Sequence, residues 1–302
     1  MIIYNNFNIN KRFKNSVIAI GNFDGLHLGH QKVLKNALSK AKKHNLKLGV
    51  ITFEPVPVMF FNKNIINHRI NCLSQKIENL KKMNIDFLNI IKFNKKFSNL
   101  TSDQFIKNIL YKHLGCKFIF VSKNFRFGKN REGNVYKLKD NEDTFFYKTI
   151  VANPIKKNRR VLSSSIIRDL IAKGNVDIVN KFLGKPWSII GKVIKGFKRG
   201  RKIGFPTCNI KPTGYILPRL GVYSVRVNIG KIKKNGIANI GYRPTFGGKS
   251  LLLEVNIFGF KGNLYKKTIE INFIKFIRAE KKFKNMRALK IQIKKDITKA
   301  KN

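Results

Sequence analysis

Two kinds of hydrophobic pattern follow one another along the chain, and the change between them lies near residues 184–187. Before it, short apolar runs such as VIAIG (17–21) and LGVITF (48–53) alternate with stretches whose apolar residues recur at helical spacing. This alternation predicts a parallel sheet with helices on its faces. After it, short β-rich runs separated by Gly, Pro and Asn predict an antiparallel barrel or sandwich. We therefore expect two domains, 1–184 and 185–302.

The same patterns predict the individual elements. In the first domain we expect four strands, at 17–21, 48–53, 86–91 and 117–121. We also expect three helices, around 33–41, 73–83 and 102–113. The second is expected to contain strands within 188–196, 221–230, 236–242, 251–260 and 268–276. A terminal helix should follow, because apolar residues recur at helical spacing on one stripe: Phe283, Met286, Leu289, Ile293 and Ile297.

The charge of the chain raises a separate hypothesis. Among 302 residues, 63 Lys and Arg face 15 Asp and Glu, a formal net charge of +48. Such a chain gains affinity for nucleic acid through counterion release. However, residues 1–186 and residues 187–302 each carry a net charge of +24, and 49 of the 63 basic residues are Lys. Lys, Asn, Ile and Phe, all abundant, have A/T-rich codons. We therefore interpret the charge mainly as the composition of an AT-rich genome, with a selected nucleic-acid surface as the less favoured alternative.

Several protein classes are not supported by the sequence. No apolar run approaches the roughly 18–20 residues of a membrane span. The opening residues MIIYNNFNINKRF have the pattern of neither a signal peptide nor a transit peptide. Cys72, Cys116 and Cys208 lie far apart with no CxxC spacing, so neither a disulfide framework nor a zinc ribbon is favoured. We expect a soluble cytoplasmic protein of unknown oligomeric state.

The segment GNFDGLHLGH (21–30) lies where the first predicted strand gives way to a helix. Ligands of open α/β sheets bind at the carboxyl ends of the strands, and a helix N-terminus favours phosphate. His27 and His30 should lie on the same side of the first helical turn, where two imidazoles can stabilise charge that develops on a phosphate. We interpret the segment as a phosphate-binding active site. A zinc site is less favoured, because there is no HExxH motif and no third ligand at a suggestive spacing.

This segment resembles the HxGH signature of nucleotidyltransferases, and its longer form resembles that of bacterial bifunctional riboflavin kinase/FAD synthetases. TFEPVPVMFF (52–61), NFRFGKNREGN (124–134) and LSSSIIRDLIAKGNV (162–176) follow in the order of that family. The resemblance implies a Rossmann-like domain in which the phosphate of FMN attacks the α-phosphate of ATP, releasing pyrophosphate and forming FAD. It implies that His27 and His30 are catalytic and that other residues bind ATP: Gly21, Asn22, Phe23, Asp24, Gly29, Asn124, Ser163, Ser164 and Arg168.

Two groups of residues in this domain keep a structural alternative. Hydroxyls and an arginine at the start of a helix form a sensible polyphosphate site, although Ser163 and Ser164 could also serve only as a helix cap. Pro57, Phe60 and Phe61 could pack on the isoalloxazine ring of the flavin, although an apolar stripe is more often part of the core.

The string GRKIGFPTCN (200–209) is the candidate site of the second domain. Its glycines suit a loop around phosphate, and Thr207 and Asn209 offer oxygen ligands for Mg²⁺. A Walker A motif is absent. The string instead resembles the GRxxGxPTAN motif of riboflavin kinases, with Cys208 in place of Ala. The resemblance implies that the motif binds ATP and Mg²⁺, with Thr207 and Asn209 near the metal and with phosphate contacts from Gly200, Arg201, Gly204 and Pro206.

Glu254 is the candidate general base of the second domain. It is one of only four acids after residue 186, and alternation in LLLEVNIFGF puts it on one face of a strand with Asn256. A carboxylate among apolar neighbours usually has a partner or a function. A solvent-facing glutamate is the alternative. The resemblance implies that Glu254 activates the 5′-hydroxyl of riboflavin for attack on the γ-phosphate of ATP.

The sequence therefore predicts a two-domain enzyme that phosphorylates riboflavin to FMN and then adenylylates FMN to FAD. Its substrates would be riboflavin, FMN and ATP, with Mg²⁺ as the cofactor and no membrane partner. An enzyme with only one working activity is the nearest alternative. A basic nucleic-acid-binding protein of enzyme ancestry is the alternative from another class.

Overall fold

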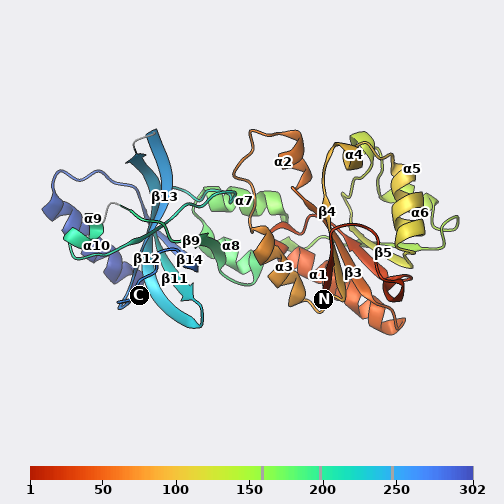
Figure 1. Cartoon of the computed structure of the whole chain (residues 1–302), viewed down its shortest axis with the longest axis horizontal. Coiled ribbons are helices and arrows are strands. Elements are labelled where there is room, and N and C mark those ends of the chain that lie inside the picture. The colour runs from red at the N-terminus through yellow and green to blue at the C-terminus, as the bar shows by residue number, and fades with distance from the viewer. Residues whose placement is uncertain (158–159, 197–198, 246–247, 302) are drawn as a thin grey trace. The chain divides into compact units, whose positions relative to one another are not determined.

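The computed structural model describes residues 1–157, 160–196, 199–245 and 248–301. The chain forms two compact units (Figure 1). The first unit comprises Met1–Ile66 and Leu73–Ser163, and the second comprises Asn67–Cys72 and Ser164–Asn302. The predicted boundary between residues 184 and 185 concerns the division of activities along the chain and stays a prediction.

The first unit is built on a six-stranded parallel sheet with the strand order β1-β4-β3-β2-β5-β6. Its strands are β1 (Ile2–Tyr4), β2 (Val17–Ile20), β3 (Leu48–Glu54), β4 (Phe87–Lys92), β5 (Phe118–Ser122) and β6 (Lys148–Ala152). All five neighbouring pairs are parallel. The four predicted strands are confirmed. The edge strands β1 and β6 were not predicted, and β1 has only three residues on which a periodicity could show.

Helices cover both faces of this sheet, because alternate residues of each strand point to opposite faces. In β2, Val17 and Ala19 join a core with α1 (Leu28–Lys43) and α3 (Leu73–Lys81). Ile18 and Ile20 join a second core with residues 105–114. The predicted helix at 102–113 begins as α5 (Ser102–Gln104) and continues as a π-helix, η3 (Phe105–His113). The shorter elements are η1 (Lys11–Phe13), η2 (Asp24–Leu26), α2 (Pro57–Phe61), α4 (Lys95–Ser98), η4 (Lys129–Arg131), α6 (Val135–Asp140), β7 (Lys156–Lys157) and β8 (Arg160–Val161).

The strand order reverses its direction of growth at one defined place, between β2 and β5. From β2 the chain runs to β3 and β4 on one side, and β5 and β6 lie on the other side of β2. Loops that leave the carboxyl ends of β2 and β5 therefore diverge, which is the topological switch point where open α/β sheets bind their ligands.

The second unit contains a six-stranded antiparallel sheet with the order β10-β13-β12-β11-β14-β9. Its elements are α7 (Ser164–Ala172), α8 (Val176–Leu183), β9 (Trp187–Lys192), α9 (Arg199–Lys202), β10 (Cys208–Ile210), β11 (Gly221–Ile229), β12 (Ile232–Thr245), β13 (Gly248–Ile257), β14 (Thr268–Ala279) and α10 (Met286–Lys301). The sheet curls, because a bridge joins its two edges: the Ile194 amide donates to the Asn209 carbonyl at 2.9 Å. Of the two predicted architectures, barrel or sandwich, the structure shows a curled, barrel-like antiparallel sheet, and the predicted strands are confirmed.

An aromatic cluster fills the inside of this barrel. Trp187 and Tyr223 are both fully buried, and their rings lie 4.8 and 5.1 Å from that of Phe273. The predicted terminal helix is α10, but Phe283 precedes it and Met286 is exposed. In the parts of the chain that the structure describes, no helix is long and apolar enough to cross a membrane.

Candidate active sites

The first site is the loop that leaves the carboxyl end of β2 and enters α1. Phe23 and Leu26 have left-handed backbone conformations, with φ of 46° and 44°. Such conformations are costly for bulky side chains and persist only where the surroundings enforce them. Both side chains are buried, at 3% and 4% exposure, so packing holds the strained loop in place. Strain of this kind is typical of functional sites.

The structure brings the two predicted histidines together at the start of α1. His27 is the N-cap of the helix, and its Nδ1 accepts a hydrogen bond from the His30 amide at 3.3 Å. The two rings stack with their centroids 3.7 Å apart and an interplanar angle of 19°. Gly29 makes this possible, since a Cβ there would lie 3.0 Å from the His27 ring. Two imidazoles thus lie at a helix N-terminus, which favours a phosphate.

The other predicted residues of this site fall in different places. Asn124 is exposed in the turn after β5. Because β2 and β5 are parallel neighbours, this turn and the loop after β2 lie at the same end of the strands. Asn22 is exposed in that loop, whereas Asp24 is buried at 1% exposure. Ser163 follows Leu162, whose carbonyl oxygen lies 3.8 Å from a Cβ built on Gly29.

Ser164 and Arg168 belong to the second unit, where α7 begins at Ser164. The Arg168 Nε donates to the His68 carbonyl at 2.9 Å. This bond fixes the orientation of a guanidinium group, whose planar fork suits the bidentate recognition of phosphate oxygens.

Two supporting residues were missed by the sequence analysis. Thr52 of β3 donates from its hydroxyl to the Asn22 carbonyl at 3.1 Å, and Lys76 of α3 donates to the Thr52 Oγ1 at 3.3 Å. Lys76 is 2% exposed. The sequence held one signal for Lys76, because it shares one stripe of the helix with the apolar residues Leu73 and Leu80.

The three candidate flavin residues lie in α2. Phe61 is 69% exposed and Phe60 is half-buried. Their rings lie 5.7 and 5.3 Å from that of Phe93, so they form the outer part of an aromatic cluster. Pro57 is the first residue of the helix, where its missing amide hydrogen costs nothing. An exposed aromatic edge of this kind is more typical of a ligand surface than of a core.

The loop of the second candidate site requires both of its predicted glycines. A Cβ on Gly200 would collide with the Phe205 carbonyl oxygen, and Gly204 has a φ of +86°. The Phe205 amide donates back to the Gly200 carbonyl at 2.8 Å, so the loop closes on itself. A hollow of about 450 Å³ lies beside this motif, and Arg201, Pro206 and Thr207 are among the residues that line it.

Strand pairing places the candidate metal ligand beside the candidate base. Asn209 of β10 lies directly opposite Glu254 of β13, and cross-strand neighbours of this kind have adjacent side chains. On the same strand as Glu254, Asn256 Nδ2 donates to the Pro206 carbonyl at 2.6 Å. This bond anchors the motif next to the carboxylate.

The residues at this position suit a hard divalent cation. Asn209 is 7% exposed, and its Oδ1 has no hydrogen-bond partner among the residues that the structure describes. A buried oxygen without a donor is costly unless a ligand satisfies it. Carbonyl, hydroxyl and carboxylate oxygens are the ligands of Mg²⁺. Across the described ranges, no cluster of three or more His, Cys, Asp and Glu side chains could hold a metal by itself.

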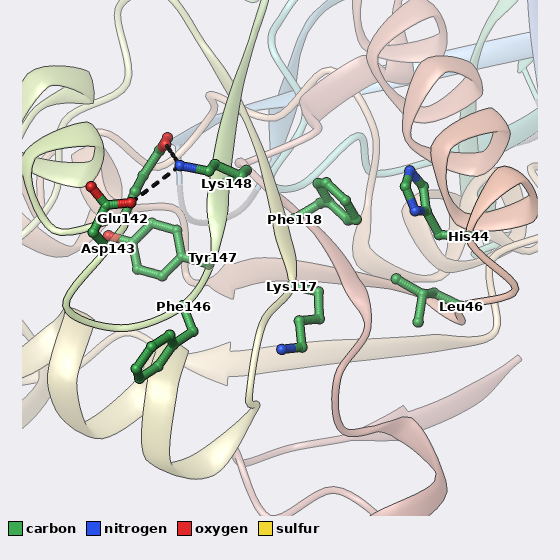
Figure 2. A pocket seen from close by; sticks show the side chains of 9 residues that line it. All are labelled: His44, Leu46, Lys117, Phe118, Glu142, Asp143, Phe146, Tyr147 and Lys148. Carbon is green, nitrogen blue, oxygen red and sulfur yellow. Dashed lines mark hydrogen bonds and ion pairs between the residues drawn. The ribbon is translucent and has the colours of Figure 1, made fainter.

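A further hollow, of about 680 Å³, lies elsewhere in the first unit (Figure 2). Its walls include Phe118 and Lys148, the first residues of β5 and β6, so it lies at the amino ends of the strands. Lys148 pairs with Glu142 at 3.2 Å and with Asp143 at 3.3 Å. The hollow therefore lies at the opposite end of the strands from the histidines, and three of its charged groups, Glu142, Asp143 and Lys148, pair with one another.

Comparison with known proteins identifies a family for each part of the chain. The family model described as FAD synthetase matches residues 9–166, and the one described as riboflavin kinase matches residues 183–302. A curated bifunctional riboflavin kinase/FMN adenylyltransferase from Buchnera aphidicola subsp. Schizaphis graminum is 42% identical, over 96% of this chain and 94% of the relative. The protein of the same description from Escherichia coli K12 is 35% identical, over 93% and 90%.

A solved structure shares the whole architecture. The crystal structure of a protein from Streptococcus pneumoniae, titled a macrolide-efflux protein, superposes with a TM-score of 0.89 at 30% identity. It covers 100% of this chain, and this chain covers 98% of it.

The fold and the two family matches define the class: a two-domain transferase that joins a nucleotidyltransferase domain to a kinase domain. The chain belongs to the family of bifunctional riboflavin kinase/FMN adenylyltransferases, the enzymes of flavin cofactor biosynthesis.

Proposed function

We propose that FMN adenylylation takes place at the loop after β2 and riboflavin phosphorylation at the motif of residues 200–209, with the two activities divided at residues 184/185. The stacked pair of His27 and His30 at the start of α1 carries the first assignment, because it puts two imidazoles at the switch point of the sheet. The second assignment is supported by the pairing of Asn209 with Glu254.

In the adenylyl transfer, an oxygen of the FMN phosphate attacks the α-phosphorus of ATP. The bond from this phosphorus to the bridging oxygen of the β-phosphate breaks, and pyrophosphate leaves. His27 and His30 donate hydrogen bonds to phosphate oxygens as negative charge builds up. Ser163, Ser164 and Arg168 hold the triphosphate, and the nucleotide is also bound by residues of the loops after β2 and β5: Gly21, Asn22, Phe23, Asp24, Gly29 and Asn124.

In the kinase reaction, Glu254 accepts the proton of the riboflavin 5′-hydroxyl while the oxygen attacks the γ-phosphorus and ADP leaves. Thr207 and Asn209 would hold Mg²⁺, which would supply neutralisation of charge on the transferring phosphoryl group. Gly200, Arg201, Gly204 and Pro206 form the loop around the phosphates. Their part is positioning, which supplies most of the catalysis in phosphoryl transfer.

The flavin contacts and the location complete the proposal. Pro57, Phe60 and Phe61 offer aromatic and apolar surface to the isoalloxazine ring of FMN. The substrates are riboflavin, FMN and ATP. The location is the cytoplasm, which suits the three free cysteines of the chain.

A product assay tests both assignments at once. Purified protein given riboflavin, ATP and Mg²⁺ should accumulate FAD, as measured by chromatography. His30→Ala should stop FAD formation and leave FMN formation within about twofold of the wild-type rate, because the loss of one transition-state contact costs about 10²–10³-fold. Equal loss of both products would contradict the assignment of sites. Product that stops at FMN in the unmodified protein would show a single working activity.

A further inference from the structure

The buried face of α3 is mostly polar. This helix packs against the loop that carries the histidines. Its buried residues are Gln75, Lys76, Asn79 and Leu80, so only one of the four is apolar. The helix lies against η2, the turn formed by Asp24–Leu26. A lysine that is 2% exposed has lost most of its hydration, and such a residue is rare unless its charge has a use.

Lys76 reaches the active-site loop through one intermediate. Its Nζ lies 3.3 Å from the Thr52 Oγ1, and this oxygen lies 3.1 Å from the Asn22 carbonyl oxygen. An ammonium group can only donate and a carbonyl can only accept. The Thr52 hydroxyl must therefore accept from Lys76 and donate to Asn22, so the direction of both hydrogen bonds is fixed.

The bonded carbonyl lies at a sensitive position of the loop. It precedes Phe23, whose φ of 46° is the first left-handed conformation of the turn, and the turn ends at His27. Because Thr52 is fully buried in β3, its hydroxyl is a rigid point of attachment. A charged donor behind this hydroxyl polarises it and strengthens its bond to the loop.

We infer that Lys76 is a positioning residue of adenylyl transfer: acting through Thr52, it holds the Asn22 carbonyl and with it the loop that carries His27 and His30. This inference rests on the assignment of FMN adenylylation to that loop. In this role Lys76 acts through Thr52 rather than on the substrate. Its removal should displace catalytic groups that remain chemically intact.

Substitutions at Thr52 separate the hydroxyl from the shape of the side chain. Thr52→Val keeps the shape and removes the hydroxyl, whereas Thr52→Ser keeps the hydroxyl and removes a methyl group. Thr52→Val should lower kcat for FMN adenylylation about tenfold or more, since small displacements of catalytic groups cost up to about 10²-fold. Thr52→Ser should stay within about threefold of the wild type. A role in packing alone predicts the opposite order and would overturn the inference.

Lys76→Met should have the same effect as Thr52→Val, and Thr52→Val/Lys76→Met should be little worse than either alone, because both remove one path. Lys81→Met is the matched control, since Lys81 is exposed on the same helix. The riboflavin kinase rate of each variant should stay within about twofold of the wild type, and an unchanged circular dichroism spectrum and thermal unfolding transition report intact folding of the first unit. If Lys76→Met does not fold, the two Thr52 variants decide.

His30→Ala in the same assay separates the role of Lys76 from the assignment of FMN adenylylation to the loop after β2. If it abolishes FAD formation while Thr52→Val and Lys76→Met leave kcat unchanged, the inference is wrong and the site assignment stands. If His30→Ala leaves FAD formation intact, the site assignment fails and the inference fails with it.

Discussion

Cys208 stands inside the motif of residues 200–209, and burial raises the pKa of its thiol from 9.0 to about 11. The thiolate is the reactive form, so a raised pKa makes this cysteine inert at neutral pH. We expect its alkylation by iodoacetamide to accelerate about tenfold per pH unit between pH 8 and pH 10, and to level off only above about pH 11. Timed alkylation followed by peptide mass spectrometry measures the rate, with folding checked at each pH. A rate that levels off near pH 9 would contradict this environment.

Single residues differ in how far the sequence could predict their place. His27 and His30 are three residues apart on one helix, so local geometry alone predicted that their rings would lie on one side. The stripe that Lys76 shares with Leu73 and Leu80 indicated its position, but its partner could not be predicted, because a lysine on a helix usually extends its charge into solvent. Its bond to Thr52 depends on how α3 packs over β3. The pairing of Asn209 with Glu254 likewise depends on a strand register that no local pattern contains.

At the scale of elements, the terminal helix α10 is attached by a buried ion pair. Asp296 is 2% exposed and accepts hydrogen bonds from Arg278 Nε at 2.9 Å and from Gln292 Nε2 at 2.8 Å. The Nη2 atom of Arg278 lies 2.7 Å from the Oδ2 atom of Asp296. The apolar stripe predicted the helix. The most buried residue of the helix, however, is Asp296, which lies in the sequence between the half-buried Ile293 and Ile297.

Asp296→Ala should therefore destabilise the second unit. Removal of one partner leaves a mostly buried guanidinium group uncompensated, a loss of about 3 kcal/mol in the free energy of unfolding. Urea unfolding followed by Trp187 fluorescence measures this loss in the second unit, because Trp187 is the only tryptophan and lies in the barrel core. Asp177→Ala, at an exposed position of α8, is the matched control and should change the free energy by less than about 0.5 kcal/mol. Equal shifts in the two variants would contradict a structural role of the pair.

At the scale of the whole molecule, the change of hydrophobic pattern near residue 184 predicted the two architectures but not the whole of the second unit. That unit also includes Asn67–Cys72, a segment from the first half of the chain. It is held by long-range hydrogen bonds: Ile216 donates to the Arg69 carbonyl at 2.8 Å, and Trp187 Nε1 donates to the Ile70 carbonyl at 2.8 Å. Single bonds between distant segments leave no periodicity in a sequence, so such a segment is found only in the structure.

The +48 charge also belongs to this scale. Both reactions use polyanionic substrates, and a positive surface raises the rate at which such substrates arrive. The proposed chemistry nevertheless depends on a few residues of other types at defined positions, above all the histidine pair and Glu254. The charge therefore bears on encounter rates and solubility, whereas the sites determine the reactions.

Two inactive variants should restore the complete conversion when they are mixed. With riboflavin, ATP and Mg²⁺, His30→Ala should stop at FMN, and Glu254→Gln should form neither FMN nor FAD because it lacks the general base. An equimolar mixture should produce FAD after a lag, since FMN released by the first variant is a substrate for the second. Chromatography over time measures the lag and the yield. As a control, Glu254→Gln given FMN directly should form FAD at the wild-type rate; if that control succeeds and the mixture accumulates no FAD, FMN does not leave the enzyme that makes it.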